Sequence, residues 1–452
     1  MNIVIVGCGK VGGELAATLT ADGNSVAVID KSQAALDRIS EDLDVLTVCG
    51  DGADVDVLKE AGIETAEIFI AVSPDDEVNL LTCVIAKTVS AAETIARVRK
   101  PMYYREADFF LKNLGISKVI NPEQQAAADI YKLLCYPALS RVDKFANGNV
   151  LIFTLHCRGE YGFAGHSLAE VRRDTKARIL ACAVYRKGEV FIPGGSFVIE
   201  KDDEVTFVTP VSDMGTFLKE HNIDNTPTMD ILISGGGKIT WYLTDRLVKA
   251  GRHVRIIEIK ESTCEVLSER FPEAEVICGD GTDRRFLIKQ GLKNADAFVA
   301  ATGIDEENII TANFARKTAN IKAITKVNRT DLRDVIEALD IDSAVFPKVV
   351  TADKIAQYVR AKASGVGENL EALYRYMGTH VEIVEFRAVE GDRGLDVPLM
   401  DLEVKKDLIV ACIIRGEEII IPSGRDKVRV GDSVIIVTSH KGITSMGDIL
   451  ES

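Results

Sequence analysis

A long internal repeat constrains the fold of this chain more than any other feature of its sequence. The two halves, divided near Pro227, carry the same motifs in the same order. The matching motifs are the glycine loops 7–12 and 235–240, the acidic residues Asp30 and Glu258, the Gly-Asp-Gly runs 50–52 and 279–281, and the segments 71–79 and 300–308. A repeat of this length indicates that each half folds as the same kind of unit.

Each half begins with apolar runs that alternate with helical patterns. In the first half the apolar runs lie at 2–6, 26–29, 45–48, 68–72 and 94–98. This alternation is typical of a doubly wound parallel sheet, and it predicts a Rossmann-like α/β domain. From about residue 142, short β-branched runs surround one short helix at 167–172, which predicts a smaller α+β domain. The same order recurs after His380.

We therefore expect four domains in tandem. Their predicted bounds are 1–141 and 227–371 for the two Rossmann-like domains, and 142–226 and 372–452 for the two smaller α+β domains. The segments 121–140 and 347–370 have helical patterns, and we expect each to join a large domain to the small domain that follows it.

The composition limits the class of function. A formal net charge of −15 argues against a protein that covers nucleic-acid phosphates. No apolar run approaches the ~20 residues of a membrane-spanning helix. The first residues enter a strand without a basic region or cleavage site, so we expect a cytoplasmic protein. The nine cysteines contain no Cys-x-x-Cys, which favours reduced core thiols over metal or redox sites.

The first glycine loop is placed to hold a nucleotide. Gly7, Gly9 and Gly12 follow the first expected strand and open the first expected helix, so they permit a tight turn, a close approach to pyrophosphate and helix packing. The N–H groups of the helix N-terminus favour phosphate. Asp30 ends the second strand, where it accepts ribose hydroxyls and repels a 2′-phosphate. We expect NAD(H) or an adenine nucleotide; the alternative is a glycine turn kept for packing.

Further candidate contacts lie at the carboxyl ends of the neighbouring strands. Ser73 follows the fourth strand, and Arg97 and Arg99 end the fifth, so they are candidates for phosphate or ribose contacts. Asp51 and Gly52 follow the third strand on the adenine side. The alternatives are a surface ion pair for Arg97 and a simple turn at Ser73.

The second glycine loop departs from the pattern. Gly235 and Gly237 keep the two glycines on the phosphate side, and Glu258 keeps the acidic position, but Thr240 replaces the packing glycine. We expect Thr240 to push the helix slightly off the sheet and to weaken binding at this second site.

No catalytic group accompanies the glycine loops. Tyr358 and Lys362 have the Tyr-x-x-x-Lys spacing of short-chain dehydrogenases, but they lie in a joining helix and are interpreted as an exposed helical face. The acidic runs 75–77 and 305–307 are interpreted as helix starts that complement the helix dipole, not as cation sites. We expect no catalytic and no metal-binding residues.

With the repeat in view, the whole chain resembles the TrkA family, the cytosolic regulatory subunits of Trk-type bacterial and archaeal potassium uptake systems. The motifs that carry the resemblance lie at 1–12, 28–30, 50–52, 71–79, 95–99 and 120–123. Both small domains are similar to the carboxyl-terminal regulatory domain of that family. The order of large, small, large and small domains is more specific than any single motif.

The resemblance implies two RCK (or KTN) copies that bind NAD(H) and ATP or ADP and assemble, as a homotetramer, beneath a membrane potassium translocator of the TrkH or TrkG type. It implies a nonenzymatic regulator, cytoplasmic and peripheral at the inner face of the membrane. By motif match the ligand contacts are Gly7, Gly9, Lys10, Val11, Gly12, Asp30, Asp51, Gly52, Ser73, Pro74 and Arg97 in the first copy, and Gly235, Gly237, Lys238, Ile239, Glu258, Gly279 and Asp280 in the second. Lys326 replaces Arg97 in the second copy. An NAD-dependent oxidoreductase and a scaffold with vestigial nucleotide sites are the alternatives.

Overall fold

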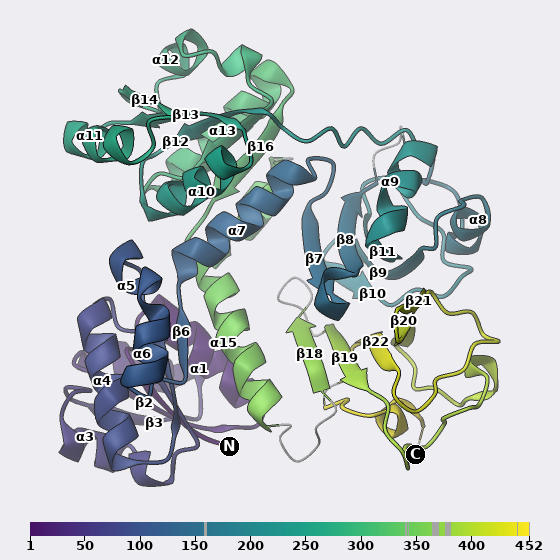
Figure 1. Cartoon of the computed structure of the whole chain (residues 1–452), viewed down its shortest axis with the longest axis horizontal. Coiled ribbons are helices and arrows are strands. Elements are labelled where there is room, and N and C mark those ends of the chain that lie inside the picture. Colours follow the sequence, from purple (N-terminus) through teal and green to yellow (C-terminus); the bar gives the residue numbers. More distant parts are fainter. Residues whose placement is uncertain are drawn as a thin grey trace. The chain divides into compact units, whose positions relative to one another are not determined.

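The computed structural model describes residues 1–157, 161–339, 341, 343–363, 370–375, 381–440 and 442–451. These residues form two compact units, and each unit is built from two separate stretches of the chain. One unit contains 1–131 and 228–359, and the other contains 132–227 and 360–452. The first unit therefore collects both parallel sheets, and the second collects both small sheets (Figure 1).

The first half contributes a six-stranded parallel sheet to the first unit. Its strands, in the order β3-β2-β1-β4-β5-β6, reverse direction of winding between β1 and β4. The elements are β1 (Asn2–Val6), α1 (Lys10–Ala21), β2 (Ser25–Asp30), α2 (Gln33–Asp42), β3 (Leu46–Cys49), α3 (Val55–Glu60), β4 (Ile68–Ala71), α4 (Asp76–Val89), β5 (Glu93–Arg97), α5 (Pro101–Arg105), α6 (Ala107–Asn113), β6 (Lys118–Ile120) and α7 (Pro122–Cys135).

The second half repeats this sheet in the order β14-β13-β12-β15-β16-β17. Its elements are β12 (Asp230–Ser234), α10 (Lys238–Lys249), β13 (His253–Glu258), α11 (Glu261–Arg270), β14 (Glu275–Cys278), α12 (Arg284–Lys289), β15 (Ala297–Ala300), α13 (Asp305–Ala319), β16 (Lys322–Lys326), α14 (Arg333–Ala338), β17 (Ser343–Val345) and α15 (Pro347–Ala363). The prediction of two Rossmann-like domains is confirmed.

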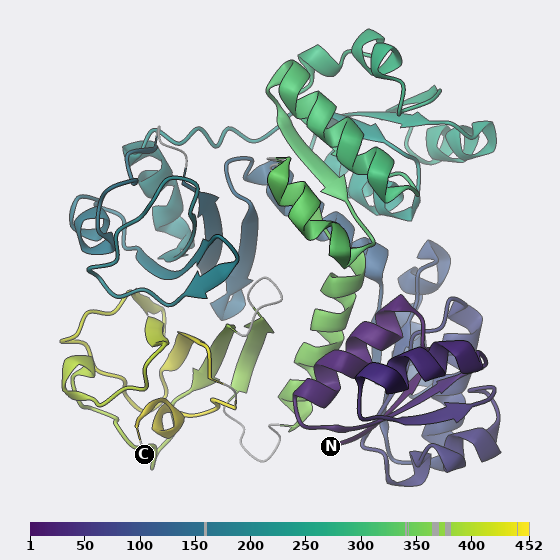
Figure 2. The same cartoon turned by 180° about the vertical axis from the view of Figure 1, so that it is seen from behind.

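Helices cover both faces of the first sheet because its strands are apolar on both sides. Along β1, Ile3 and Ile5 point to one face and Val4 and Val6 to the other, and all four are buried. The first face packs against α1 and α2, and the second against α3 and α4. The face of α1 and α2 also holds α15, which follows the second sheet in sequence (Figure 2). The second half of the chain thus contributes the helix α15 to the core of the first large domain.

The second unit holds two antiparallel sheets with corresponding strand orders, β10-β9-β11-β8-β7 and β18-β19-β22-β20-β21. The elements of the first are β7 (Arg141–Phe145), β8 (Val150–His156), α8 (Leu168–Arg173), β9 (Leu180–Arg186), β10 (Glu189–Phe191), β11 (Glu204–Pro210) and α9 (Val211–Glu220). Those of the second are β18 (Leu370–Arg375), β19 (Glu382–Arg387), β20 (Leu408–Arg415), β21 (Glu418–Ile420) and β22 (Ser433–Thr438). One cluster of buried side chains draws on both sheets.

Several details differ from the sequence-based expectation. The small domains begin with strands β7 and β18, which were not predicted, and the first small domain has a second helix, α9. In the second small domain a single 3₁₀ turn at Leu399–Asp401 takes the place of the expected short helix. The first joining helix ends at Cys135, earlier than expected; the second is described as far as Ala363, and Leu370, where it was expected to end, begins β18. The parts of these expectations that fall on 364–369 and 376–380 lie outside the described residues, and the four domain bounds stay predictions.

The cysteines are only partly a core feature. Cys83, Cys157, Cys182, Cys264 and Cys412 are buried, whereas Cys49 and Cys278 are exposed, and all nine are free thiols. The expectation that all of them are core residues is therefore wrong for two positions, because both lie at the carboxyl end of an edge strand. Among the described residues, every helix is too short or too polar to cross a membrane.

Candidate functional site

The first glycine loop joins β1 to α1 at the point where the strand order reverses. Gly7 has a φ of +103°, and a Cβ atom there would lie 2.8 Å from the backbone nitrogen of Ser73, so only glycine fits. Gly9 is the N-cap of α1 and provides no side-chain cap. The N–H groups of the first turn of α1 are therefore available to a ligand.

Gly9 differs from the glycines that packing explains. Its φ is −72°, which any residue adopts, and a Cβ atom on it would meet nothing within 4 Å. Gly237 in the second loop has the same two properties. Nothing in the protein's own packing requires glycine at either position. A side chain there would project into the space beside the helix N-terminus, where a ligand backbone would need to approach.

Two other glycines of the expected sites are packing residues. A Cβ atom on Gly52 would lie 2.4 Å from the side chain of Val6, and one on Gly279 would lie 2.4 Å from the ring of Phe286. The small size of Gly52 thus lets the loop after β3 lie close to the sheet, and that of Gly279 lets the loop after β14 lie close to α12. Gly12 is also enclosed, because a Cβ atom on it would lie 1.8 Å from the carbonyl oxygen of Gly7.

Thr240 occupies the place of Gly12 in the second loop. Its hydroxyl donates a hydrogen bond of 2.5 Å to the carbonyl oxygen of Gly235, and its side chain is fully buried. Since a Cβ atom at Gly12 would overlap the same carbonyl of the first loop, α10 must stand further from its loop than α1 does. The loop itself keeps its conformation, with a φ of +101° at Gly235. The hydrogen bond from the Thr240 hydroxyl therefore ties the first turn of α10 to the glycine loop.

The acidic residue at the end of each second strand fastens the glycine loop. Asp30 accepts hydrogen bonds from the backbone N–H of Cys8 at 2.6 Å and of Ser32 at 2.9 Å. Glu258 accepts from the N–H of Gly236 at 2.6 Å in the same way. From the sequence, these carboxylates were assigned to ribose binding only, and their hydrogen bonds to the glycine loop were not predicted. Each carboxylate oxygen keeps a further lone pair, so a ribose hydroxyl and the loop can share one acid.

A buried asparagine, which sequence reasoning left unassigned, organises the loop after each fourth strand. Asn79 is fully buried; its side chain accepts from the N–H of Ser73 at 2.8 Å and donates to the carbonyl oxygens of Ser73 and Arg97. Asn308 makes the equivalent bonds in the second half. The only signal for it was that both copies carry asparagine at this position. Its effect is to hold the ends of the fourth and fifth strands together beside the glycine loop.

Arg97 is half-buried at this junction. Its Nη1 atom donates to the carbonyl oxygen of Val72 at 3.5 Å, and its buried Nε atom has no hydrogen-bond partner among the described residues. Burial lowers the pKa of its guanidinium. The alternative of a surface ion pair is therefore wrong. Lys326 stands in its place in the second half, where Nζ donates to the carbonyl oxygen of Thr302 at 2.9 Å and burial lowers its pKa.

The remaining candidate contacts are more exposed or use only backbone atoms. Asp51 is exposed and pairs with Lys31 at 2.9 Å, which lowers its pKa. Asp280 accepts from the N–H and hydroxyl of Thr282. Pro74 lies in the loop before α4. The side chains of Val11 and Ile239 are buried in the core, so only their N–H groups can face a ligand.

The two large domains contact each other close to the glycine loops. Asn121 donates to the hydroxyl of Tyr242 at 2.8 Å, and the ring of Tyr242 meets that of Tyr104 edge-on. Lys238, next to Gly237, is half-buried; burial and then the charge of Arg99 lower its pKa. Arg329 lowers the pKa of the Asp331 carboxyl in the second copy, and Lys10 of the first loop lies close enough to add a smaller lowering effect. Each glycine loop is thus bordered by residues of the other copy.

Tyr358 is not the exposed residue that its sequence position suggested. It packs against the core of the first large domain, and its hydroxyl hydrogen-bonds to the carboxylate of Glu93. Its place in the fold is structural, because it fastens α15 to β5. The acidic start of α4 agrees with its interpretation as a helix cap, since Asp75 accepts from the N–H of Val78.

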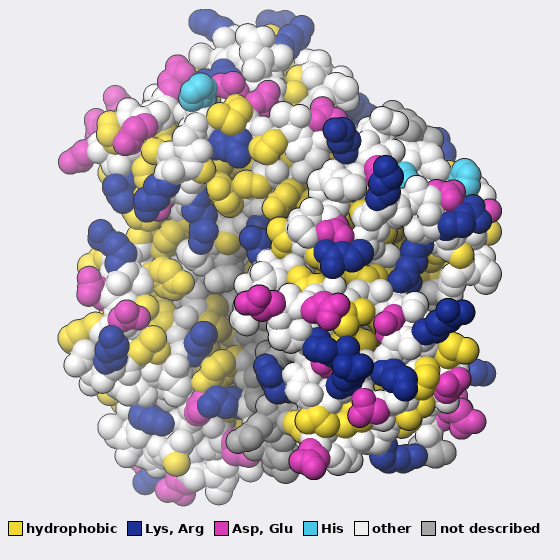
Figure 3. Space-filling model, turned by 45° about the vertical axis from the view of Figure 1, so that its right-hand side comes forward, with side chains coloured by type: hydrophobic (Ala, Val, Ile, Leu, Met, Phe, Trp, Pro, Cys, Tyr) yellow, Lys and Arg dark blue, Asp and Glu magenta, His cyan; other side chains and the backbone are white. Residues whose placement is uncertain are grey.

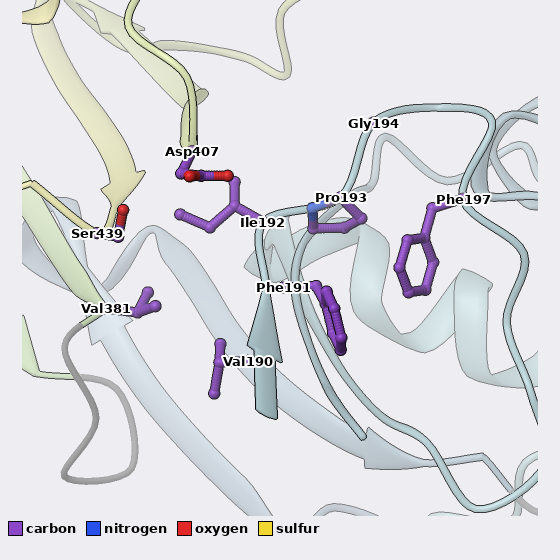
Figure 4. Close-up of a pocket in the computed structure, with 9 residues that line it drawn as sticks. All are labelled: Val190, Phe191, Ile192, Pro193, Gly194, Phe197, Val381, Asp407 and Ser439. Carbon is purple, nitrogen blue, oxygen red and sulfur yellow. The ribbon is translucent and has the colours of Figure 1, made fainter. Parts of the chain in front are cut away.

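Two other features of the chain lie outside the glycine loops. In the second unit a cavity of about 260 Å³ is lined by Val190, Phe191, Ile192, Pro193, Gly194, Phe197, Val381, Asp407 and Ser439 (Figure 4). It contains none of the expected nucleotide contacts. On the face in Figure 3, Lys and Arg side chains are interspersed with Asp and Glu, so the net negative charge does not form one uniform patch there. The described residues hold no cluster of three or more potential metal ligands.

Comparison with known proteins identifies the family. The TrkA-N domain matches residues 3–122 and 231–347, and the TrkA-C domain matches residues 160–222. The "Trk system potassium uptake protein TrkA homolog" of Archaeoglobus fulgidus is 32% identical over 451 residues, which cover 99% of this chain and 100% of that protein.

Solved structures share the fold at lower identity. The GsuK channel bound to NAD is 18% identical, with a TM-score of 0.63 over 97% of this chain and 76% of that one. GsuK bound to ADP is 16% identical, with a TM-score of 0.50 over 80% of this chain and 69% of that one. Since the TrkA-N domain covers both repeats and the archaeal relative matches end to end, this chain belongs to the TrkA family of Trk system potassium uptake proteins.

Proposed function

We propose that this protein is a nonenzymatic regulatory subunit of a Trk-type potassium uptake system, whose glycine loops bind NAD(H) and adenine nucleotides. The observation that carries nucleotide binding is the open position of Gly9 and Gly237. Each caps a helix without a side-chain cap, and the protein's packing gives neither a reason to be glycine. A pyrophosphate that approaches the backbone at these two points supplies that reason.

The proposed first site consists of groups near the point where the strand order of the first sheet reverses. The loop residues Gly9, Lys10, Val11 and Gly12 offer N–H groups to phosphate, whereas Gly7, whose N–H donates to the carbonyl oxygen of Ile29, permits the turn and the close approach of the ligand. The half-buried Arg97 adds a guanidinium whose Nε atom has no partner among the described residues. The remaining proposed contacts are Asp30 for the ribose and Asp51, Gly52, Ser73 and Pro74 at its border. The equivalent second site uses Gly235, Gly237, Lys238, Ile239, Glu258, Gly279 and Asp280.

A regulatory role suits sites of this kind. A ligand that binds one conformation better than another shifts the population between them, and no bond needs to be made or broken. An NAD-dependent oxidoreductase would need a proton donor or acceptor beside the nicotinamide. The Tyr358 hydroxyl, which its sequence spacing offered for that task, is engaged with Glu93.

The relatives support a proposal for the membrane partner of this chain. The archaeal relative is named as a Trk system potassium uptake protein, and the shared fold occurs in a channel described as bound to NAD. We propose that a homotetramer of this chain docks on a TrkH- or TrkG-like potassium translocator at the inner face of the membrane. Because anionic lipid repels a chain with a net charge of −15, the contact should run through that protein and not through lipid.

Calorimetric titration of the full-length protein with NAD, NADH, ADP and ATP tests the binding. Two sites per chain with different preferences would support the sensor, and the absence of saturable binding at millimolar ligand would favour a scaffold with vestigial sites. Trp241, the single tryptophan, lies in the first turn of α10, so its fluorescence should report ligand at the second loop. Regulation itself is tested by potassium uptake through the reconstituted translocator with and without this chain and each nucleotide.

A further inference from the structure

Two cysteines of the second large domain lie beside the backbone of Glu258. Cys278 ends β14 and is paired with Glu258 of β13 in the strand register. Cys264 lies in α11, with its Sγ atom 3.3 Å from the carbonyl oxygen of Glu258. The Sγ atom of Cys278 lies 3.9 Å from the carbonyl oxygen of the next residue, Ile259. The two thiols therefore lie on the carbonyl groups of consecutive residues.

The two thiols are close neighbours, because their sulfur atoms lie beside the carbonyl oxygens of consecutive residues, and they differ in exposure. Cys264 is 8% exposed, and burial, followed by the effect of the neighbouring Cys278, raises its pKa to about 11. Cys278 is exposed. An oxidant in solution therefore reaches Cys278 first. Cys264 is buried, and its raised pKa keeps its thiol protonated.

We propose that Cys264 and Cys278 form a redox-active dithiol that a hydroperoxide converts into an intrachain disulfide. The sulfur of Cys278 attacks the peroxide O–O bond, which leaves a sulfenic acid on Cys278 and releases an alcohol, or water from hydrogen peroxide. The sulfur of Cys264 then attacks the sulfenic sulfur, forms the S–S bond and releases water. The peroxide takes up the two electrons that the two thiols lose.

The first half of the chain supplies a matched control. Cys49 ends β3 as Cys278 ends β14; it is exposed, and its Sγ atom lies 3.8 Å from the carbonyl oxygen of Lys31. The position that corresponds to Cys264 is held by Leu36 of α2, which has no thiol. Cys49 therefore shows how an exposed thiol at the same strand end behaves when the matching helix position carries no thiol; Cys8, whose Sγ atom lies 3.4 Å from the carbonyl oxygen of Ala35, belongs to the glycine loop.

The disulfide would alter the border of the second glycine loop. It removes the two S–H groups that face the carbonyl oxygens of Glu258 and Ile259 and ties α11 to the end of β14. The carboxylate of Glu258 holds the N–H of Gly236. On the basis of the proposed function, we therefore expect oxidation to weaken nucleotide binding at the second loop and to leave the first loop unchanged.

Peptide mass spectrometry of the full-length protein tests the dithiol. The reduced protein is treated with hydrogen peroxide, and the remaining thiols are alkylated. We expect a linked peptide pair containing Cys264 and Cys278, lighter by two hydrogen atoms, that dithiothreitol separates again. In Cys264→Ser the sulfenic acid of Cys278 should persist and be trapped by dimedone, and we expect the same of Cys49 in the wild type. Cys49→Ser should leave the linked pair intact.

The proposal is overturned if Cys264 stays alkylatable after Cys49 and Cys278 have both been oxidised. It is equally overturned if dimedone labels Cys278 as heavily in the wild type as in Cys264→Ser. Nucleotide titration of the oxidised and reduced protein then tests the consequence at the second loop. Equal affinities in the two forms would refute that consequence, whereas no binding in the reduced form would refute the proposed function and leave the disulfide result standing.

Discussion

Replacing Asp30 tests whether one carboxylate both fastens the glycine loop and holds the ligand. Asp30→Ala removes the acceptor for the N–H groups of Cys8 and Ser32. A hydrogen bond to a charged group contributes about 1.5–3 kcal/mol when buried. Only the Cys8 bond is partly buried, and water replaces the exposed Ser32 bond, so we expect the free energy of unfolding to fall by about 1–2 kcal/mol. The variant should therefore still fold.

The effect on binding should be larger than the effect on folding. Loss of the ribose hydrogen bonds should cost about 1–3 kcal/mol of binding free energy, which raises the Kd at the first loop roughly 5- to 150-fold. Asp30→Glu should be much milder, because Glu258 already holds the second loop with a glutamate. Glu258→Ala is the matched variant for the other site.

The assay combines calorimetry with tryptophan fluorescence. Calorimetry counts both sites, whereas the fluorescence of Trp241 follows the second loop. Asp30→Ala should weaken the calorimetric transition that leaves Trp241 unchanged, and Glu258→Ala should weaken the one that quenches it. A folded Asp30→Ala protein that binds both equivalents with wild-type affinity would refute the assignment of Asp30 to the ligand.

Three further predictions follow from contacts in the structure. Gly12→Ala should weaken nucleotide binding at the first loop, because its Cβ atom would overlap the carbonyl oxygen of Gly7. Thr240→Gly should alter binding at the second loop only. Unchanged binding of Gly12→Ala in calorimetry would contradict this prediction. Burial lowers the pKa of Lys348 to about 8, so the unfolded chain binds more protons from about pH 8 to 10.5, and stability should rise with pH across that window. Lys348→Met should therefore be more stabilising at pH 7 than at pH 10.5 in urea denaturation, and an equal effect at both would count against it. Arg178 lowers the pKa of Asp213 to about 2, so the stability from this pair should be present above pH 4 and be lost as the pH falls toward 2. Asp213→Asn should therefore destabilise the protein at pH 7 and not at pH 2. A difference in stability that persists at pH 2 would disprove the pairing.

Much of the fold could be predicted because its signals are local. The alternation of apolar runs and helical patterns requires only neighbours in sequence, and it placed the five strands 2–6, 26–29, 45–48, 68–72 and 94–98 within two residues of their observed bounds. Short edge strands gave a weaker signal. β7 and β18 were missed because each is a short strand at the edge of its sheet, paired on one side only, and charged residues interrupt its apolar pattern.

The candidate site was only partly accessible from the sequence. The glycine loops and acidic residues are visible because their chemistry depends on spacing along one strand, loop and helix. The reasons for the individual glycines are not, since Gly9 faces open space while Gly52 is pressed against Val6, and only the packed structure separates these cases. The buried Asn79 was likewise missed, because its role is to join the ends of two strands that lie far apart in the chain.

The sequence by itself determined the duplication, the two parallel sheets and the glycine loops with an acidic residue at the end of each second strand, because each is written in patterns a few residues long. Only the tertiary structure decided that α15 of the second half packs on the core of the first, that Asp30 fastens its own loop, and that Cys264 and Cys278 lie on the carbonyl groups of consecutive residues. These contacts join residues from different elements. They are set by how packed layers bury apolar surface together, and no short stretch of sequence contains that information.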